Sequence, residues 1–358
     1  MALGVGIVGI NPDRGWARES HAPAVAHLDG LTLVAVASRR GDQARRAARE
    51  LGAATGYGDA RELIEDPAVD IVGVAASVPA HRELILTAAR AGKHLYSEWP
   101  LGVDATEADD IAAATATAGV HTAVGLQARA HPAVVEAARL VAEGRIGRVL
   151  SISVQSTTAG FGPVVPADEF YLEDAATGMN LTTIQAMHTL DLIERVVGPW
   201  EELAAQLDTQ FPELAVGDER RPERRTLPDH VLVTGRAGGT PVSVEVAGGR
   251  PPSDTPFALT VVGDRGKLQL RGGAPRGFQA GVLTLSLDGE PHPVNLGELA
   301  GLPDSAVNVA ATLASLRDDI VAGTRRTADF EHGRTLAHLV DTLRSSDAQG
   351  RRLPAPNR

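Results

Sequence analysis

The sequence predicts an α/β protein of two parts. The first is an amino-terminal doubly wound parallel sheet, and the second is a carboxyl-terminal α+β domain with a large, mainly antiparallel open sheet. Over residues 1–126, apolar runs of strand length alternate with helix-length segments, as in βα units joined by right-handed crossovers. Over residues 127–358, strand-length runs follow one another with few helices between them. A chain of 358 residues is also long for a single core, so two domains are expected.

Composition narrows the class of protein. The formal net charge of −11 and the pI near 5.5 argue against a surface for nucleic acid or anionic membranes. The chain has no cysteine, which excludes a disulfide framework and thiolate chemistry, and no His/Asp/Glu spacing suggests a metal site. No apolar run has the length of a membrane span, and the first strand begins without a preceding basic segment. We therefore expect a cytoplasmic protein without a signal peptide.

The first strand is the apolar run at residues 5–10, which is typical of a strand buried on both faces. Gly4, Gly6 and Gly9 spell G-x-G-x-x-G, but phosphate-binding glycines must follow the strand and open a helix. We therefore expect the working turn at residues 9–16, before a helix that starts near residues 20–23. Amides at such a helix start can hold a pyrophosphate; a plain loop is the alternative. The cofactor candidates here are Gly9, Asn11, Gly15 and Trp16.

The second strand, residues 31–37, is followed by Ser38, Arg39 and Arg40. A fold that binds NAD usually offers an acidic residue here, which bonds the ribose 2′-hydroxyl. Guanidinium groups instead pair well with a phosphate dianion. The three residues therefore predict an NADP site, with NAD still possible. The alternative is that the two arginines simply end the strand in solvent.

Four further strands complete the first sheet, at residues 55–57, 70–76, 94–97 and 121–126. Helices are expected at 42–51, 59–65 and 104–118, and one more helix follows His81 and ends at residue 91. The carboxyl ends of parallel strands share one edge, where ligands bind. Polar or aromatic residues stand at three of these ends. The cofactor candidates are Ser77, His81, Glu98, Trp99 and Gln127, and the substrate candidate is Arg129. For His81 and Arg129 the alternative is a structural bond at a strand end.

The second part has strand candidates at residues 149–157, 203–208, 231–235, 241–246, 258–262, 268–270 and 282–287. We expect one helix at 179–196 and two across 308–345, whereas the Pro-, Arg- and Gly-rich segments 212–228 and 247–256 are predicted loops. Tyr171 in a predicted loop is a substrate candidate, and His131 and His230 are candidates for the substrate face.

Several features recur in order along the chain: the Gly9 turn, Val78-Pro79 with His81, the Glu98-X-Pro100 turn, Gln127 with Arg129, and His188 followed by Asp191. In these the chain resembles the glucose–fructose oxidoreductase, inositol dehydrogenase and rhizopine-catabolism (Gfo/Idh/MocA) family over its whole length. The turn ending Gly15-Trp16 and the segment 178–191 resemble the branch of the yeast galactose-pathway repressor. The resemblance implies an NAD(P)-binding Rossmann domain and an open carboxyl-terminal sheet through which the protein forms a homo-oligomer.

The chain departs from this family at two catalytic positions. The family's enzymes use a Glu-Lys-Pro turn and an Asp and a His one helical turn apart, the His acting as acid/base on the reacting hydroxyl. Here Trp99 replaces the Lys and Ile184 replaces the Asp, and neither Lys93 nor Lys267 is placed to substitute. Trp99 would instead stack on a nicotinamide or a sugar face.

His188 is therefore the candidate catalytic residue, and also a substrate-binding candidate. The alternative is a structural bond to Asp191 or Asp229. Two functions stay open. One is an oxidoreductase, NADP-dependent, that acts on a small-molecule sugar, polyol or related hydroxy compound. The other is a non-catalytic dinucleotide-responsive regulator or sensor that binds a protein partner, because the chain shows no DNA-binding motif.

Overall fold

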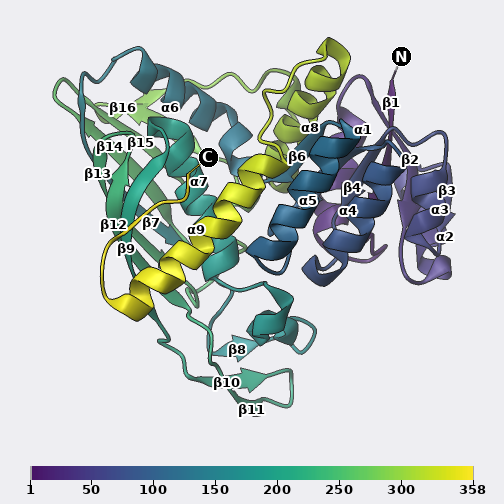
Figure 1. Cartoon of the computed structure of the whole chain (residues 1–358), viewed down its shortest axis with the longest axis horizontal. Helices are drawn as coiled ribbons and strands as arrows, with labels where there is room; N and C mark the ends of the chain where they lie inside the picture. The colour runs from purple at the N-terminus through teal and green to yellow at the C-terminus, as the bar shows by residue number, and fades with distance from the viewer. Residues whose placement is uncertain (1, 358) are drawn as a thin grey trace. The chain divides into compact units, whose positions relative to one another are not determined.

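The computed structural model describes residues 2–357. The chain forms two compact units (Figure 1). The first comprises Met1–Gln127 with Leu296–Arg334, and the second comprises Ala128–Asn295 with Thr335–Arg358. No helix within residues 2–357 is long and apolar enough to cross a bilayer.

The first unit contains the predicted parallel sheet, in the order β3-β2-β1-β4-β5-β6. Its strands are β1 (Leu3–Val8), β2 (Leu31–Ala37), β3 (Thr55–Tyr57), β4 (Ile71–Val74), β5 (His94–Glu98) and β6 (Thr122–Gly125). The strand order reverses between β1 and β4, and such a switch point is where open α/β sheets bind ligands. The predicted doubly wound sheet is thus confirmed.

Helices follow the strands as βα units require. They are η1 (Ala17–His21) with α1 (Ala22–His27), α2 (Gly41–Leu51), α3 (Ala60–Glu65), α4 (His81–Arg90) and α5 (Ala105–Ala118). Helix α1 begins at Ala22, within the expected range 20–23, but the π-helical turn η1 precedes it. The helical segment begins at Ala17 because the carbonyl of Gly15 already accepts the amides of Arg18 at 3.1 Å and Glu19 at 3.0 Å.

The predicted carboxyl-terminal helices are α8 (Asp304–Ala322) and α9 (Phe330–Gln349). Helix α8 belongs to the first unit, where the Arg317 guanidinium donates to the carbonyl of Asp29 at 2.6 Å. The loop after α8 is organised by buried Asp319, whose carboxylate accepts the amides of Arg326 and Thr327, each at 2.8 Å.

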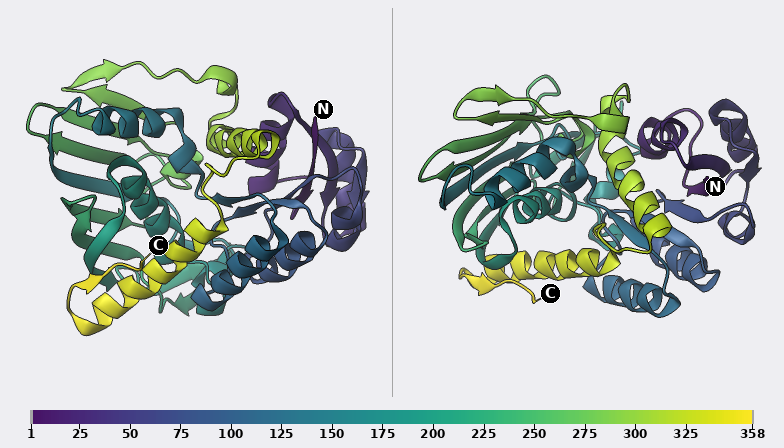
Figure 2. Two further views of the ribbon diagram at one scale, coloured as in Figure 1. Left: turned by 45° about the horizontal axis from the view of Figure 1, so that its top comes forward. Right: turned by 90° about the horizontal axis from the view of Figure 1, so that it is seen from above.

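The second unit contains a nine-stranded sheet in the order β17-β16-β15-β14-β7-β13-β12-β9-β18. Every neighbouring pair is antiparallel except β7 with β13, so the predicted mainly antiparallel sheet is confirmed. Helices α6 (Pro132–Ala142) and α7 (Met187–Val197) lie along one face of it (Figure 2). The strands are β7 (Val149–Thr157), β9 (Trp200–Asp208), β12 (His230–Ala237), β13 (Thr240–Ala247), β14 (Phe257–Gly263), β15 (Lys267–Gly272), β16 (Thr284–Leu287), β17 (Glu290–His292) and β18 (Leu353–Pro354).

The segment 212–228, predicted as a loop, instead contains a hairpin. Strands β10 (Glu213–Val216) and β11 (Arg221–Arg224) pair with each other, and β10 also pairs with β8 (Val164–Val165). Its small core consists of Val165, Leu214 and Val216. The prediction failed because Val165 lies far away in sequence and supplies the apolar surface that makes so polar a hairpin stable.

Candidate functional site

In the first unit, the residues that follow β1, β4, β5 and β6 share the carboxyl edge of one parallel sheet. The turn after β1 starts at Gly9, whose φ is +99°. A Cβ at Gly9 would lie 2.6 Å from the carbonyl oxygen of Ala75, so only glycine fits between the two strand ends. Asn11 then closes a small turn by accepting the amide of Asp13 at 2.9 Å.

The same turn has free space beside its backbone at Gly15, just before η1 begins. Gly15 has a φ of +101°, and a Cβ placed there would meet no atom within 4 Å. The neighbouring Trp16 has a buried indole Nε1 without a hydrogen-bond partner among residues 2–357. An open stretch of backbone beside a buried N–H donor is suited to a ligand with acceptor oxygens.

Three arginines gather where β2 meets α2. Arg39 and Arg40 follow Ser38 and are exposed, and the Arg40 guanidinium lies 3.3 Å from Asp42, whose pKa it lowers. Arg45, which the sequence reasoning missed, has its guanidinium only 3.2 Å from the position of a Cβ on Gly41. Arg45 follows Gly41 by one helical turn, and this spacing is the signal that could have revealed it.

His81 braces the turn after β5. Its Nδ1 lies 3.0 Å from the carbonyl of Pro100, and its Nε2 lies 3.0 Å from the carbonyl of Ala76. The ring is fully buried, and burial lowers the pKa of His81. Both ring nitrogens therefore face the backbone of the two strand ends, while Ser77 beside them is exposed.

Glu98, the last residue of β5, is held by His21. The Glu98 Oε1 and the His21 Nε2 are 2.6 Å apart, and the His21 side chain is 1% exposed. His21 also meets Tyr96 edge-on, with ring centroids 4.9 Å apart, and burial raises the pKa of Tyr96 well above its usual value. Sequence reasoning did not find this pair because 77 positions separate the two residues. Trp99, next in the chain, is buried at 6% exposure.

Gln127 follows β6 and is 2% exposed. Its side-chain oxygen is buried and accepts no hydrogen bond from residues 2–357. A buried amide oxygen without a donor is costly unless a water or a ligand supplies one. Gln127 and Trp16 thus provide an unpaired acceptor and an unpaired donor in the same unit.

In the second unit, His188 lies in the first turn of α7 and is 4% exposed. Asp191, three positions later, forms an ion pair with Arg129. Asp229, the other partner considered for His188, accepts the amides of Gln210 at 2.7 Å and Phe211 at 2.9 Å. Arg129 thus contacts α7 through its ion pair with Asp191, which lies three positions after His188 on the same helix.

Tyr171 lies in a short 3-10 helix, η4 (Phe170–Glu173), and is 46% exposed. Arg225 anchors this helix through two bonds to Glu173, of 2.8 and 2.6 Å. Arg225 also bonds Asp229 at 2.9 Å and the carbonyls of Phe161 and Gly162 at 2.6 and 3.0 Å. The sequence reasoning missed this buried arginine, which organises the loops around Tyr171.

The two additional histidine candidates have structural partners. His131 is fully buried and caps α6, its Nδ1 accepting the amide of Ala133 at 3.0 Å. Burial lowers the pKa of His131 to about 4. His230 lies 3.1 Å from Glu245 on the neighbouring strand. Over residues 2–357, no group of three His, Cys, Asp or Glu side chains is arranged to hold a metal ion.

Two family models match successive parts of the chain. The model for an oxidoreductase family with an NAD-binding Rossmann fold matches residues 3–126, and the model for the Gal80p carboxyl-terminal domain matches residues 132–272.

Curated relatives include both regulators and dehydrogenases. The galactose/lactose metabolism regulatory protein GAL80 of Saccharomyces cerevisiae is 27% identical over 290 residues, 75% of this chain and 67% of that protein. Dehydrogenase aclE of Aspergillus oryzae is 29% identical over 248 residues, 68% of each chain. Levoglucosan dehydrogenase of Pseudarthrobacter phenanthrenivorans is 31% identical over 181 residues, 50% of this chain and 46% of that protein.

Solved structures share the fold. A super-repressor mutant of Gal80p from Saccharomyces cerevisiae superposes with a TM-score of 0.87 at 23% identity, covering 99% of this chain and 98% of that one. Levoglucosan dehydrogenase in complex with NADH and levoglucosan gives a TM-score of 0.83 at 21% identity, with 100% of each chain covered.

Proposed function

Because the chain belongs to the Gfo/Idh/MocA oxidoreductase family, close to its Gal80-like branch, we propose that it is an NADP-dependent oxidoreductase acting on the CH–OH group of a sugar, polyol or related small hydroxy compound. The observation that carries this proposal is the dinucleotide cradle at the carboxyl edge of the first sheet. The cradle has an open turn at Gly15 and arginines after β2, where an NAD site usually has an acidic residue.

The residues of the cradle fit a nicotinamide dinucleotide. The open backbone at Gly15 and the buried indole N–H of Trp16 suit the oxygens of a pyrophosphate or ribose. The second half of such a sheet serves the second mononucleotide, and there the buried oxygen of Gln127 suits an amide donor, which the nicotinamide carboxamide has. Glu98, which pairs with His21, would keep the backbone beside this second mononucleotide in a fixed position. The nicotinamide itself would supply the hydride chemistry when bound.

We assign the 2′-phosphate of NADP to the arginines where β2 meets α2. Arg39 and Arg40 would pair with the phosphate, and the Ser38 hydroxyl would donate to it. Arg40 would have to exchange part of its contact with Asp42 for the phosphate. Arg45, folded against Gly41, would add a third guanidinium. Guanidinium groups are well matched to phosphate because their N–H donors bind two oxygens at once.

In the chemical step, His188 would take the proton of the substrate hydroxyl while the hydride leaves the same carbon, and would return it in the reverse direction. The ion pair between Asp191 and Arg129 would hold Arg129 as a substrate contact. Trp99 would form an apolar wall where related enzymes have a lysine, so it would orient the substrate without transferring a proton.

A regulator that senses the dinucleotide is the second candidate. The observations that favour it are Trp99 and Ile184 at the positions of the family's Lys and Asp, together with the Gal80p-like carboxyl-terminal domain. In that function the same cradle would bind the dinucleotide, and a protein partner would take the place of a substrate.

Calorimetry with NADP⁺, NAD⁺ and their reduced forms tests the cofactor. We expect NADP⁺ to bind more tightly, and the double variant Arg39→Gln, Arg40→Gln to lose this preference. Arg61→Gln is the matched control, because Arg61 is an exposed arginine of α3 paired with Glu83. Tighter binding of NAD⁺ by the wild type would refute the phosphate assignment.

Turnover tests the reaction. A panel of aldoses, inositols and anhydrosugars with NADP⁺, and of the matching ketones with NADPH, should give activity that His188→Ala abolishes. Tight cofactor binding without turnover across the panel would reject the enzyme in favour of the regulator. A cofactor-dependent protein partner recovered by pull-down would then support the second candidate.

We also propose that the protein is a homodimer formed through the outer face of the nine-stranded sheet. The exposed residues of its central strands include the small and uncharged Ser151, Ser153 and Thr234, with Leu232 36% exposed. Light scattering should give twice the chain mass, and Ser153→Arg should give a monomer; a monomeric wild type would refute this proposal.

A further inference from the structure

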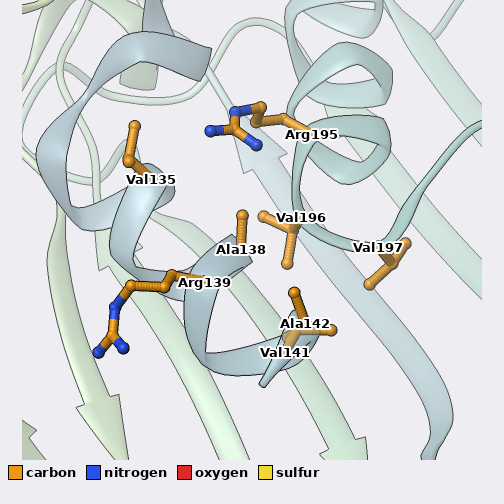
Figure 3. A pocket seen from close by; sticks show the side chains of 8 residues that line it. All are labelled: Val135, Ala138, Arg139, Val141, Ala142, Arg195, Val196 and Val197. Atoms are coloured by element: carbon orange, nitrogen blue, oxygen red, sulfur yellow. The ribbon is translucent and has the colours of Figure 1, made fainter. Parts of the chain in front are cut away.

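A groove of about 440 Å³ lies on the surface of the second unit, between α6 and the end of α7 (Figure 3). None of its lining residues is among the cofactor or substrate candidates. Six are apolar and two are arginines, and they are Val135, Ala138, Arg139, Val141, Ala142, Arg195, Val196 and Val197. Its volume lies within the range of small-ligand sites.

The two arginines of the groove differ in their partners. Arg139 bonds Glu136 at 2.7 Å and Glu143 at 2.6 Å, and its side chain points away from the groove. The Arg195 side chain instead reaches from α7 toward α6 (Figure 3). It forms no hydrogen bond or ion pair with any residue of the described range 2–357. Arg195 is thus the one cation of this groove without a paired carboxylate among the described residues.

The surroundings of Arg195 disfavour its charge. Its partial burial and the nearby Arg129 lower the pKa of Arg195, and Asp191 offsets only part of this effect. Its position in the last turn of α7 is favourable for a cation, but a helix end supplies only about half an elementary charge. A bound anion would supply the missing counter-charge.

We propose that this groove binds an amphipathic monoanion, with its carboxylate on the Arg195 guanidinium and its hydrocarbon chain along Val135, Ala138 and Val196. The guanidinium fork matches a carboxylate, and the apolar side chains would shield the hydrocarbon chain from water. A single carboxylate fits better than a dianion because Arg139 is already neutralised by two glutamates.

Binding of the anion in the groove would also affect the candidate catalytic residue His188 on α7. Arg195 follows Asp191 by one helical turn, and Asp191 pairs with Arg129. An anion on Arg195 would reduce its repulsion of Arg129 and so stabilise the arrangement beside His188. The inference does not depend on the proposed oxidoreductase function.

The test titrates octanoate into the full-length protein with isotopically labelled valine methyl groups and follows them by NMR. Octanol, which lacks the charge, and acetate, which lacks the chain, are the matched probes. We expect octanoate to shift the methyl signals of Val135 and Val196. Arg195→Gln should weaken binding about tenfold, as for loss of a charged hydrogen bond, and Arg195→Lys should restore part of the affinity. Arg139→Gln, the control in the same groove, should change it less than about twofold.

The proposal is overturned if octanol binds as tightly as octanoate, or if Arg139→Gln weakens binding as much as Arg195→Gln. It is equally overturned if the shifts occur at other valines or if none appears up to about 10 mM octanoate, a concentration well above that of a specific small-ligand site. Unchanged thermal unfolding of Arg195→Gln ensures that its loss of binding is not a loss of fold.

Discussion

Replacing His131 with asparagine should reduce the loss of stability that this protein undergoes on acidification. His131 is fully buried at the amino terminus of α6, where its Nδ1 accepts the amide of Ala133 at 3.0 Å. Asparagine presents a carbonyl oxygen at a similar position and is among the best residues at a helix start. His131→Asn therefore keeps the capping bond and removes the titrating group.

The magnitude follows from the pKa of His131. Burial lowers it from 6.5 to about 4, so between these pH values the unfolded chain binds a proton that the folded chain does not. The stabilisation is therefore fully present above pH 6.5 and is lost as the pH falls toward 4. At about 1.4 kcal/mol for each pKa unit, the complete loss is about 3 kcal/mol. About 2 kcal/mol of it should already be lost at pH 4.5.

Urea unfolding at pH 7.5, 6.5, 5.5 and 4.5 measures this effect. The free energy of unfolding of the wild type should fall by about 2 kcal/mol more than that of His131→Asn over this range. Burial also lowers the pKa of His81 and His94, but both proteins contain these residues, so their contributions cancel. His230→Asn, in a half-buried pair with Glu245, is the control and should follow the wild type. A difference between wild type and His131→Asn that does not change with pH would refute the reasoning.

Three further outcomes are expected. Arg225→Met should cost about 3–5 kcal/mol in unfolding free energy, because buried Glu173 and Asp229 would lose their shared cation; a loss below 1 kcal/mol in urea unfolding would contradict this. Gly9→Ala should lower the melting temperature and weaken dinucleotide binding in calorimetry, because its Cβ would lie 2.6 Å from a backbone oxygen of the next strand end; unchanged binding would remove Gly9 from the cradle. Burial raises the pKa of Asp319, but its hydrogen bonds outweigh this effect and lower the pKa from 3.8 to about 2. Asp319→Asn should therefore cost about 2 kcal/mol in unfolding free energy above pH 4, and less as the pH falls toward 2. A difference between wild type and variant that stays constant from pH 5 to pH 3 in urea unfolding would contradict this.

Much of the fold followed from local patterns. The continuous apolar run of β2 and the alternating pattern of β7 each predicted a strand with the observed bounds, 31–37 and 149–157. Such patterns are readable because burial on two faces or on one face leaves a distinct periodicity in the chain. The order of βα units then limited the first sheet to a doubly wound topology.

Other elements depended on distant partners. The hairpin of β10 and β11 was predicted as a loop, because its apolar surface is completed by Val165. The candidate site shows the same limit. Glu98 was singled out by its place at a strand end, but its partner His21 comes from another element, 77 positions away. Arg225 lies in a polar segment, and nothing in that segment indicated that its guanidinium would be fully buried.

By itself, therefore, the sequence determined the fold class, the edge of the first sheet that carries the cofactor candidates, and the departures at Trp99 and Ile184. These depend on residue type, spacing and strand direction, which the linear chain contains. Only the tertiary structure decided that His81 and His131 are engaged by the backbone, that His21 holds Glu98, and that Trp16 and Gln127 keep unpaired buried atoms. Hydrogen-bond pairing and burial arise between segments far apart in sequence, and they become defined only when the chain has folded.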